Sequence, residues 1–120
     1  MRIALFAALL LIAATTKAGT LETCQAKEKN AYDIQSCTEA ERTRSINRLR
    51  ESDPLVLTAI RKETNGNQYR ALMRAYRMAQ AQHVRERQTV CAKKVAAHER
   101  IACEADMNFA HIDQLTRFTK

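Results

Sequence analysis

Four cysteines are the residues of this sequence with the clearest potential for chemistry: Cys24, Cys37, Cys91 and Cys103. An even number of cysteines in a short exported chain predicts disulfides, here two of them. The alternative is a zinc site built from all four thiolates, but the closely spaced C-x2-C pairs typical of structural zinc sites are missing. Leu21 lies three residues before Cys24 as in a lipid-attachment box, but Glu22 and Thr23 fit that box badly. We therefore expect two disulfides, no metal and no thiolate nucleophile.

The pairing of the cysteines is a geometric problem. Cys24 and Cys37 are 13 residues apart and Cys91 and Cys103 are 12 apart, which is roughly 18 to 20 Å along an unbroken helix. A disulfide needs Cα atoms within about 7 Å, so pairing within each interval requires a reversal of the chain. The first interval has a break near residues 32–36, whereas the second has no Gly or Pro. We favour the local pairs, Cys24–Cys37 and Cys91–Cys103. The other two connectivities stay open, one of them the crossed pairing Cys24–Cys103 with Cys37–Cys91.

The remaining reactive residues form no catalytic pattern. His83, His98 and His111 are the only histidines, and we expect each to be a core or surface residue. The serines lack the G-x-S-x-G turn of a hydrolase nucleophile. No pattern places two carboxylates in one cleft, as glycoside hydrolysis requires. We therefore expect no enzyme and no cofactor.

Residues 1–18 have the features of a signal peptide. Arg2 supplies a positive charge, residues 3–14 an apolar stretch, and residues 16–18 a cleavage site with small side chains. Cleavage after residue 14 or 16 is the alternative to cleavage after residue 18. The apolar stretch is shorter than the roughly 20 residues of a transmembrane helix. We expect no transmembrane segment, and a periplasmic or secreted mature protein of residues 19–120.

The chain is basic. It has 20 lysines and arginines against 13 acidic residues, so its formal charge is +7, and this falls to +5 without residues 1–18. A positive field attracts anionic partners, so an anionic envelope surface or an acidic protein is a candidate partner. The alternative is that the surplus arginines only keep the helices soluble. We expect no nucleic-acid partner.

The composition predicts an all-α fold. The sequence has one Pro, two Gly and no Trp, and it lacks the alternating β-branched runs of strands. No repeat, low-complexity tract or linker divides residues 19–120. We expect these residues to form a single helical domain, a small disulfide-stapled bundle of about four helices.

Local signals place the first helices. A short helix is predicted over residues 21–30, and a second over residues 37–50, because Ser36 with Glu39 and Thr38 with Glu41 match the capping box. Asp53 and Pro54 predict a new start, since Asp caps helices and Pro suits their first turn. A third short helix over residues 55–63 then ends at Asn65-Gly66-Asn67, where Gly66 can adopt a positive φ.

The most regular pattern is a long amphipathic helix over residues 67–93. Residues at three- and four-residue steps define its core face: Tyr69, Leu72, Met73, Tyr76, Ala79, Gln80, His83, Val84, Arg87, Val90 and Cys91. A neighbouring stripe, Arg70, Arg74, Arg77 and Arg85, could bind phosphate or carboxylate groups, although such stripes are usually the solvated face.

The segment over residues 92–119 keeps a helical pattern, and the position of its break is left open. Its apolar anchors are Val95, Ile101, Met107, Phe109, Ile112, Leu115 and Phe118.

Spaced residues in the second half of the chain match a known pattern. Gln80, His83, Arg87 and Cys91 occupy the positions of Q-x-x-W-x-x-x-R-x-x-x-C, with histidine in place of tryptophan. Cys103, His111 and Leu115 match a following cysteine, arginine and leucine, with histidine in place of arginine. Together with Cys24 and Cys37, these residues make the chain resemble the LprI-type lysozyme-inhibitor family of small exported helical proteins.

The resemblance implies a protein partner, namely a peptidoglycan hydrolase of the cell envelope that the protein would inhibit. The missing indole removes a large core anchor that the pattern provides. Animal lysozymes are basic, so a basic inhibitor would need a local acidic patch, because fields of like sign slow encounter. The alternative function is a basic helical module that binds anionic polymer or lipid head groups. The sequence predicts no oligomeric state.

Overall fold

Helices make up nearly all of residues 19–120, the part of the chain that the computed structural model describes. The elements are α1 (Thr20–Lys27), α2 (Ala31–Arg61), α3 (Gly66–Cys91), α4 (Ala97–Leu115) and a 3-10 turn, η1 (Thr116–Phe118). No strand occurs in this part, so the predicted all-α bundle of about four helices is confirmed. The predicted signal peptide, residues 1–18, lies outside the described residues. No helix within residues 19–120 is both long and apolar enough to cross a membrane.

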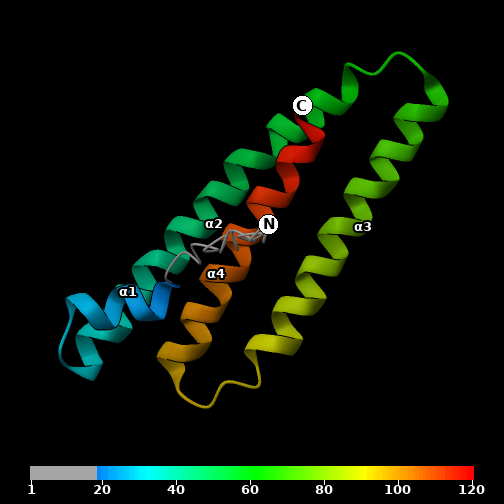
Figure 1. Ribbon diagram of the computed structural model, residues 1–120. Helices are drawn as coiled ribbons and strands as arrows, with labels where there is room; N and C mark the ends of the chain where they lie inside the picture. Colours follow the sequence, from blue (N-terminus) through cyan, green and yellow to red (C-terminus); the bar gives the residue numbers. More distant parts are fainter. Residues whose placement is uncertain (1–18) are drawn as a thin grey trace, which may run out of the picture.

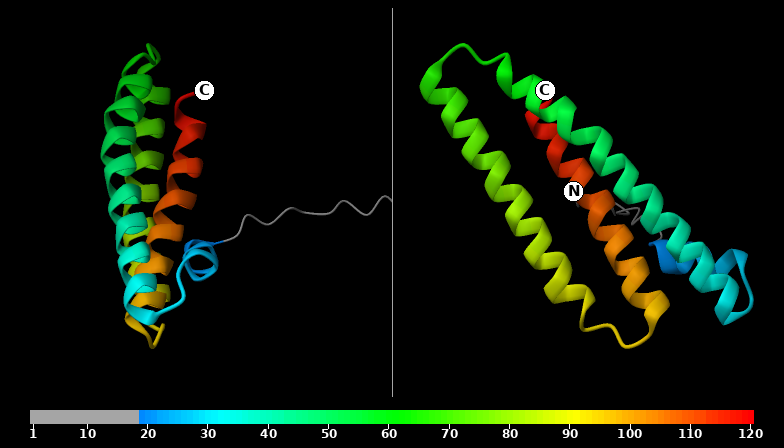
Figure 2. Two further views of the ribbon diagram at one scale, coloured as in Figure 1. Left: turned by 90° about the vertical axis from the view of Figure 1, so that its left-hand side faces the viewer. Right: turned by 180° about the vertical axis from the view of Figure 1, so that it is seen from behind.

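The three long helices lie side by side. α2 and α3 form an antiparallel pair, and α4 runs parallel to α2 along one face of that pair (Figure 1). Seen from behind, α4 lies between α2 and α3 (Figure 2). The closest packing is between α2 and α4. The short α1 lies across one end of the bundle, where the amide and hydroxyl of Thr20 both donate to Oδ1 of Asp106 at 2.9 and 2.6 Å.

The start of α2 lies earlier than the capping-box pattern predicts. The helix begins at Ala31, and the side chain of Asn30 caps it by accepting a hydrogen bond from the Asp33 amide at 2.9 Å. Ser36 and Thr38 are therefore interior residues, and the hydroxyl of Thr38 donates to the Gln35 carbonyl at 2.8 Å. The helix starts at this earlier position because Asn30 is a good N-cap residue and Asp33 places a carboxylate in the first turn.

α2 is one helix, so the predicted break at Asp53 and Pro54 is wrong. Pro54 lies inside the helix, where a proline costs about 3 kcal/mol through its missing N–H and its ring. Continuing the helix buries Val56 and Ile60, each 1 % exposed, and burial of such side chains contributes about 1.5–3 kcal/mol each. Asp53 does not cap a helix. Its carboxylate accepts hydrogen bonds from α3 instead.

The turn between α2 and α3 also differs from the prediction for Gly66. No residue in the described part has a positive φ, and Gly66 is the first residue of α3. The side chain of Asn65 caps this helix by accepting from the Gln68 amide at 3.1 Å. Asn is among the best N-cap residues. Gly66 therefore belongs to the start of α3 and does not terminate α2.

Both disulfides follow the favoured local pairing. Cys24 and Cys37 have Cα atoms 5.8 Å apart, and Cys91 and Cys103 have Cα atoms 5.5 Å apart. The second pair is possible because α3 ends at Cys91 and α4 begins at Ala97. The chain reverses between them without Gly or Pro.

The guanidinium of Arg100 holds this reversal in place. Its Nη1 donates to the carbonyl oxygens of Lys94 and Val95 at 3.1 and 2.6 Å. The carbonyl oxygens of this turn thus accept hydrogen bonds from a side chain instead of from the backbone amides of a continuing helix.

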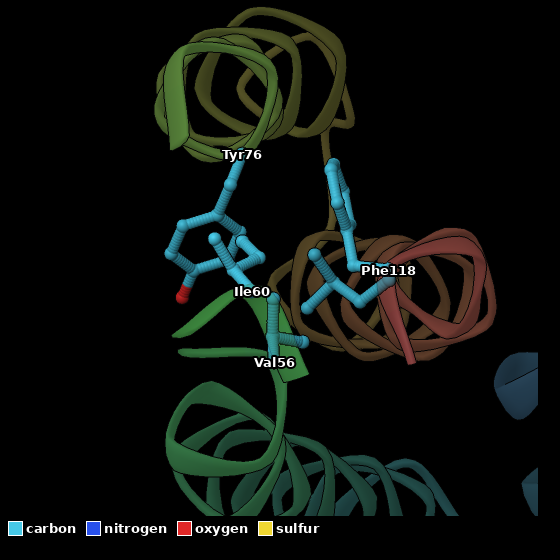
Figure 3. Close-up of a cluster of buried hydrophobic side chains, with 5 residues drawn as sticks. Val56, Ile60, Tyr76 and Phe118 are labelled. Atoms are coloured by element: carbon cyan, nitrogen blue, oxygen red, sulfur yellow. The ribbon is translucent and has the colours of Figure 1, made fainter. Parts of the chain in front are cut away.

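The main apolar cluster lies at the end of the bundle away from the disulfides. Figure 3 shows Val56 and Ile60 of α2 facing Tyr76 of α3 and Phe118 of η1, and Leu115 completes the cluster. The rings of Tyr76 and Phe118 meet edge to face, with centroids 5.8 Å apart. Three predicted core positions are exposed instead: Val84, Val90 and Val95 at 41, 45 and 91 %. The first two lie on the outer side of α3, and the third lies in the turn before α4.

Truncation of the cluster gives a direct test of this packing. We expect Ile60→Ala to lower the free energy of unfolding by about 2–5 kcal/mol, because it removes a fully buried side chain and leaves a cavity. Leu55→Ala is the matched control on the same helix, since Leu55 is 65 % exposed. Urea unfolding measures both. Equal losses in the two variants would contradict the packing.

Candidate functional site

A set of polar side chains fills the middle of the bundle. We call it the polar core, and its residues are Ser45 and Asp53 of α2, Tyr76, Gln80, His83 and Arg87 of α3, and Asn108 and His111 of α4. The four α3 members follow one another at steps of four, three and four residues, so they share one face of the helix. The polar core lies between the apolar cluster and the Cys91–Cys103 disulfide.

Asn108 is the junction of the three long helices. It is 1 % exposed. Its Oδ1 accepts from Arg87 Nη1 at 2.9 Å and pairs with His83 Nε2 at 3.0 Å. Its Nδ2 donates to the hydroxyl of Ser45 at 3.0 Å, and that hydroxyl donates to the Arg42 carbonyl at 2.6 Å. A buried amide with partners at both of its polar atoms avoids the cost of unmade hydrogen bonds.

Asp53 is the corresponding acceptor nearer the apolar cluster. The Tyr76 hydroxyl donates to its Oδ1 at 2.7 Å, and Gln80 Nε2 donates to the same oxygen at 2.9 Å. Burial raises the pKa of Tyr76 to about 12, and the hydrogen bond and negative charge of Asp53 act in the same direction. Tyr76 therefore stays a neutral donor at physiological pH.

His83 and His111 stack on each other across the α3–α4 interface. Their ring centroids are 4.1 Å apart and their planes differ by 4°. His83 Nε2 meets the Oδ1 acceptor of Asn108, and His111 Nε2 meets the Oε1 acceptor of Gln80. Because both partners are carbonyl oxygens, each Nε2 must carry the hydrogen. The two rings are then neutral imidazoles of the same tautomer.

A second proton on either ring is unfavourable. Within the described residues the buried Nδ1 of His111 has no hydrogen-bond partner. Burial is the main reason that the pKa of both histidines lies below its ordinary value. The positive charge of Arg87 adds to this effect at His83. At His111, any proton taken up by His83 acts in the same direction, followed by the charge of Arg117.

Other groups raise the pKa of the two histidines, but their effect is smaller than that of burial. The Asn108 hydrogen bond and the charge of Glu86 raise the pKa of His83, and the Gln114 side chain and the charge of Asp53 raise that of His111. A groove of about 300 Å³ between α3 and α4 is lined in part by the two histidines, and its other lining residues include Gln82, Glu86, Gln114 and Arg117.

The structure brings most of the pattern residues together. Gln80, His83 and Arg87 all contact partners in the polar core, and Cys91 closes the same face of α3 through its disulfide. His111 stacks on His83, and Leu115 is buried in the apolar cluster at 2 % exposure. These side chains form their hydrogen bonds, stacking contact and disulfide across helix interfaces, although Gln80 and Arg87 stay partly exposed. What the arrangement does chemically is to hold the three long helices in a fixed register.

Sequence reasoning missed three members of the polar core, which are Ser45, Asp53 and Asn108. Asp53 was interpreted as a helix cap. The signal for Asn108 was its place three residues before His111 on a helix that is otherwise apolar on that face, because such a pair points inward together.

The predicted arginine stripe lies apart from the polar core. Arg70, Arg74, Arg77 and Arg85 are all exposed on α3. Arg70 donates a hydrogen bond to Oδ1 of the neighbouring Asn67. The two ion pairs within residues 19–120 involve other arginines, namely Arg42 with Glu104 and Arg44 with Glu41.

The stacked histidines predict acid sensitivity. The unfolded chain takes up protons below the ordinary pKa of 6.5 while the folded protein resists them. The free energy of unfolding is therefore fully present above that pH and falls as the pH decreases below it, by at most about 1.4 kcal/mol per pH unit for each ring. Urea unfolding between about pH 8 and about pH 5 measures the slope. Most carboxylates stay ionised over this pH range, so they contribute little to it.

Variants assign this slope to the pair. His111→Gln should flatten it, because one buried imidazole is removed. His98→Gln is the matched control, since His98 lies outside the polar core, and it should keep the wild-type slope. A wild-type stability that does not change over this pH range would show that the two rings are not held as the structure has them.

Comparison of the chain with protein-family models, with curated proteins and with solved structures finds no match. The resemblance to the LprI-type family therefore rests on the spaced residues of the sequence.

Proposed function

We propose that the protein is an exported binding protein without catalytic activity, and that it inhibits a lysozyme-type peptidoglycan hydrolase in the cell envelope. The observation that supports this most is the position of the pattern residues Gln80, His83, Arg87 and Cys91. All four lie on one face of α3 and hold α4 against it. The residues that carry the resemblance are thus the residues that build this fold.

Disulfides agree with an exported protein. Two local disulfides join α1 to α2 and α3 to α4, and such bonds persist in oxidising compartments. They also limit the motion of the helices. A rigid surface loses less conformational entropy on binding a partner, so it suits an inhibitor.

An uneven charge distribution removes the conflict between a basic inhibitor and a basic target. Residues 19–41 carry five acidic and two basic residues, for a net charge of −3, whereas residues 42–120 carry a net charge of +8. The acidic residues of this first part are Glu22, Glu28, Asp33, Glu39 and Glu41. We call residues 19–41 the acidic end, and it consists of α1 and the first turns of α2. Complementary charge there would speed association with a basic hydrolase.

Charge reversal tests this proposal. We expect the purified protein at micromolar concentration to slow peptidoglycan cleavage by at least one enzyme of a muramidase panel. Glu22→Lys with Glu39→Lys should weaken the inhibition at least about tenfold, because like charges then face each other across the interface. Both glutamates are exposed, so the fold should tolerate the change.

Arg74→Glu with Arg77→Glu is the control, since it reverses two charges on α3, away from the acidic end. We expect it to leave inhibition unchanged. A panel that stays fully active would exclude hydrolase inhibition.

A second candidate function is the binding of anionic polymer or lipid head groups of the envelope. It is favoured by Arg70, Arg74, Arg77 and Arg85, which lie exposed along α3 and form no ion pair within residues 19–120. Contacts of exposed charges are screened by salt.

Binding to anionic vesicles should therefore weaken between about 10 mM and about 150 mM salt, and Arg74→Gln with Arg77→Gln should weaken it further at low salt. Cosedimentation with the vesicles measures both effects. Vesicle binding that is insensitive to salt would exclude this function.

A further inference from the structure

A groove separate from the histidine pair lies near the disulfide end, where α2 and α3 flank α4. Its volume is about 680 Å³, and the side chains lining it include Arg42, Thr43, Arg87, Gln88, Arg100 and Glu104. Small-molecule sites typically have volumes of about 300–1,000 Å³ and a few convergent polar groups. We call this surface the arginine groove. None of its three arginines belongs to the exposed stripe on α3.

The three guanidiniums come from three different helices, and each has a fixed partner. Arg42 of α2 pairs with Glu104 of α4 at 3.1 Å. Arg87 of α3 donates to the buried amide oxygen of Asn108 at 2.9 Å. The third guanidinium, that of Arg100, donates to the carbonyls of the turn before α4. All three side chains are half-buried, so little rotamer freedom remains to be lost when a ligand binds.

The guanidiniums keep donors for a ligand. An arginine has five N–H donors. Within residues 19–120 the hydrogen bonds of Arg42, Arg87 and Arg100 use only Nη1 of each side chain. The Nε and Nη2 groups of the three arginines are then available to an acceptor in the groove. Thr43 and Gln88 add a hydroxyl and an amide to the lining.

The charge of the groove selects the class of ligand. Three guanidiniums and the carboxylate of Glu104 leave a net charge of +2 in a half-buried space. A phosphate monoester or inorganic phosphate carries a charge of about −1.5 to −2 near pH 7 and three strong acceptor oxygens. Arginine matches phosphate oxygens with paired N–H donors. A simple carboxylate would neutralise only half of the charge.

We propose that the arginine groove is a binding site for a phosphoryl group, carried either by free phosphate or by an anionic lipid head group. The site does not depend on hydrolase inhibition, because the acidic end lies on other residues. It also differs from salt-sensitive attraction to the α3 stripe, since it requires three fixed guanidiniums from three elements.

Titration with inorganic phosphate at constant ionic strength tests the site. In the 15N-labelled full chain, we expect saturable shifts of the side-chain Nε signals of Arg42, Arg87 and Arg100. Arg42→Gln and Arg100→Gln should each weaken binding at least about tenfold, the value of one charged hydrogen bond. Arg74→Gln is the control with the same change of charge on the exposed stripe, and it should leave binding unchanged.

A variant that keeps the charge distinguishes loss of the binding site from loss of the fold. Arg100→Lys retains the cation but lacks the paired donors, and it should bind more weakly than wild type while keeping the wild-type NMR spectrum outside the groove. No saturable shift up to about 10 mM phosphate, or equal weakening by Arg74→Gln, would overturn the proposal. Equal affinity for acetate would also overturn it, because the groove would then not distinguish phosphate from a carboxylate.

Competition distinguishes the two sources of the phosphoryl group. Vesicles of phosphatidylcholine with phosphatidic acid are compared with vesicles of phosphatidylcholine alone. Release of bound protein from the phosphatidic acid vesicles by inorganic phosphate supports the head group as ligand. Saturable binding of phosphate without any vesicle binding supports a free solute.

Discussion

Burying an amide and two imidazoles at the centre of a helical bundle is costly unless their N–H donors meet acceptors. Asn108 meets this condition by contacting Ser45, His83 and Arg87 at once. These contacts require one rotation and one translation of each helix, because a shift by a single residue would separate the partners. Apolar packing is less selective, since it needs mainly shape and volume. The polar core therefore fixes the register of the bundle.

The two ends of the bundle depend on this centre. The apolar cluster of Val56, Ile60 and Phe118 lies on one side of it, and the Cys91–Cys103 disulfide lies on the other. Arg87 links the centre to the surface, because its guanidinium donates to Asn108 and also lines the arginine groove. Apart from Arg87, the residues of the charged surfaces that we propose for binding lie outside the polar core, and their positions are set by it.

The helical class, the long α3 and the local disulfides could be predicted from periodicity, composition and spacing. The continuity of α2 could not, because Pro54 gives a strong local signal and the burial that outweighs it comes from α3 and η1. The position of the chain reversal before α4 could not be predicted either, because the residue that stabilises it, Arg100, follows the turn. Asp53 and Asn108 were missed because their partners are more than 20 residues away in the sequence. A local pattern can show that Asn108 points inward, but it does not identify these partners.

The register of the bundle depends on His83 and His111 being neutral, stacked and hydrogen-bonded through Nε2. Long-range 1H–15N correlation NMR of the imidazole nitrogens at neutral pH tests it most directly. We expect both rings to carry their hydrogen on Nε2, with an unprotonated Nδ1 and slow exchange of the Nε2 hydrogen with solvent. Signals of an imidazolium, or of the tautomer protonated at Nδ1, would show that the rings do not meet Asn108 and Gln80 as described.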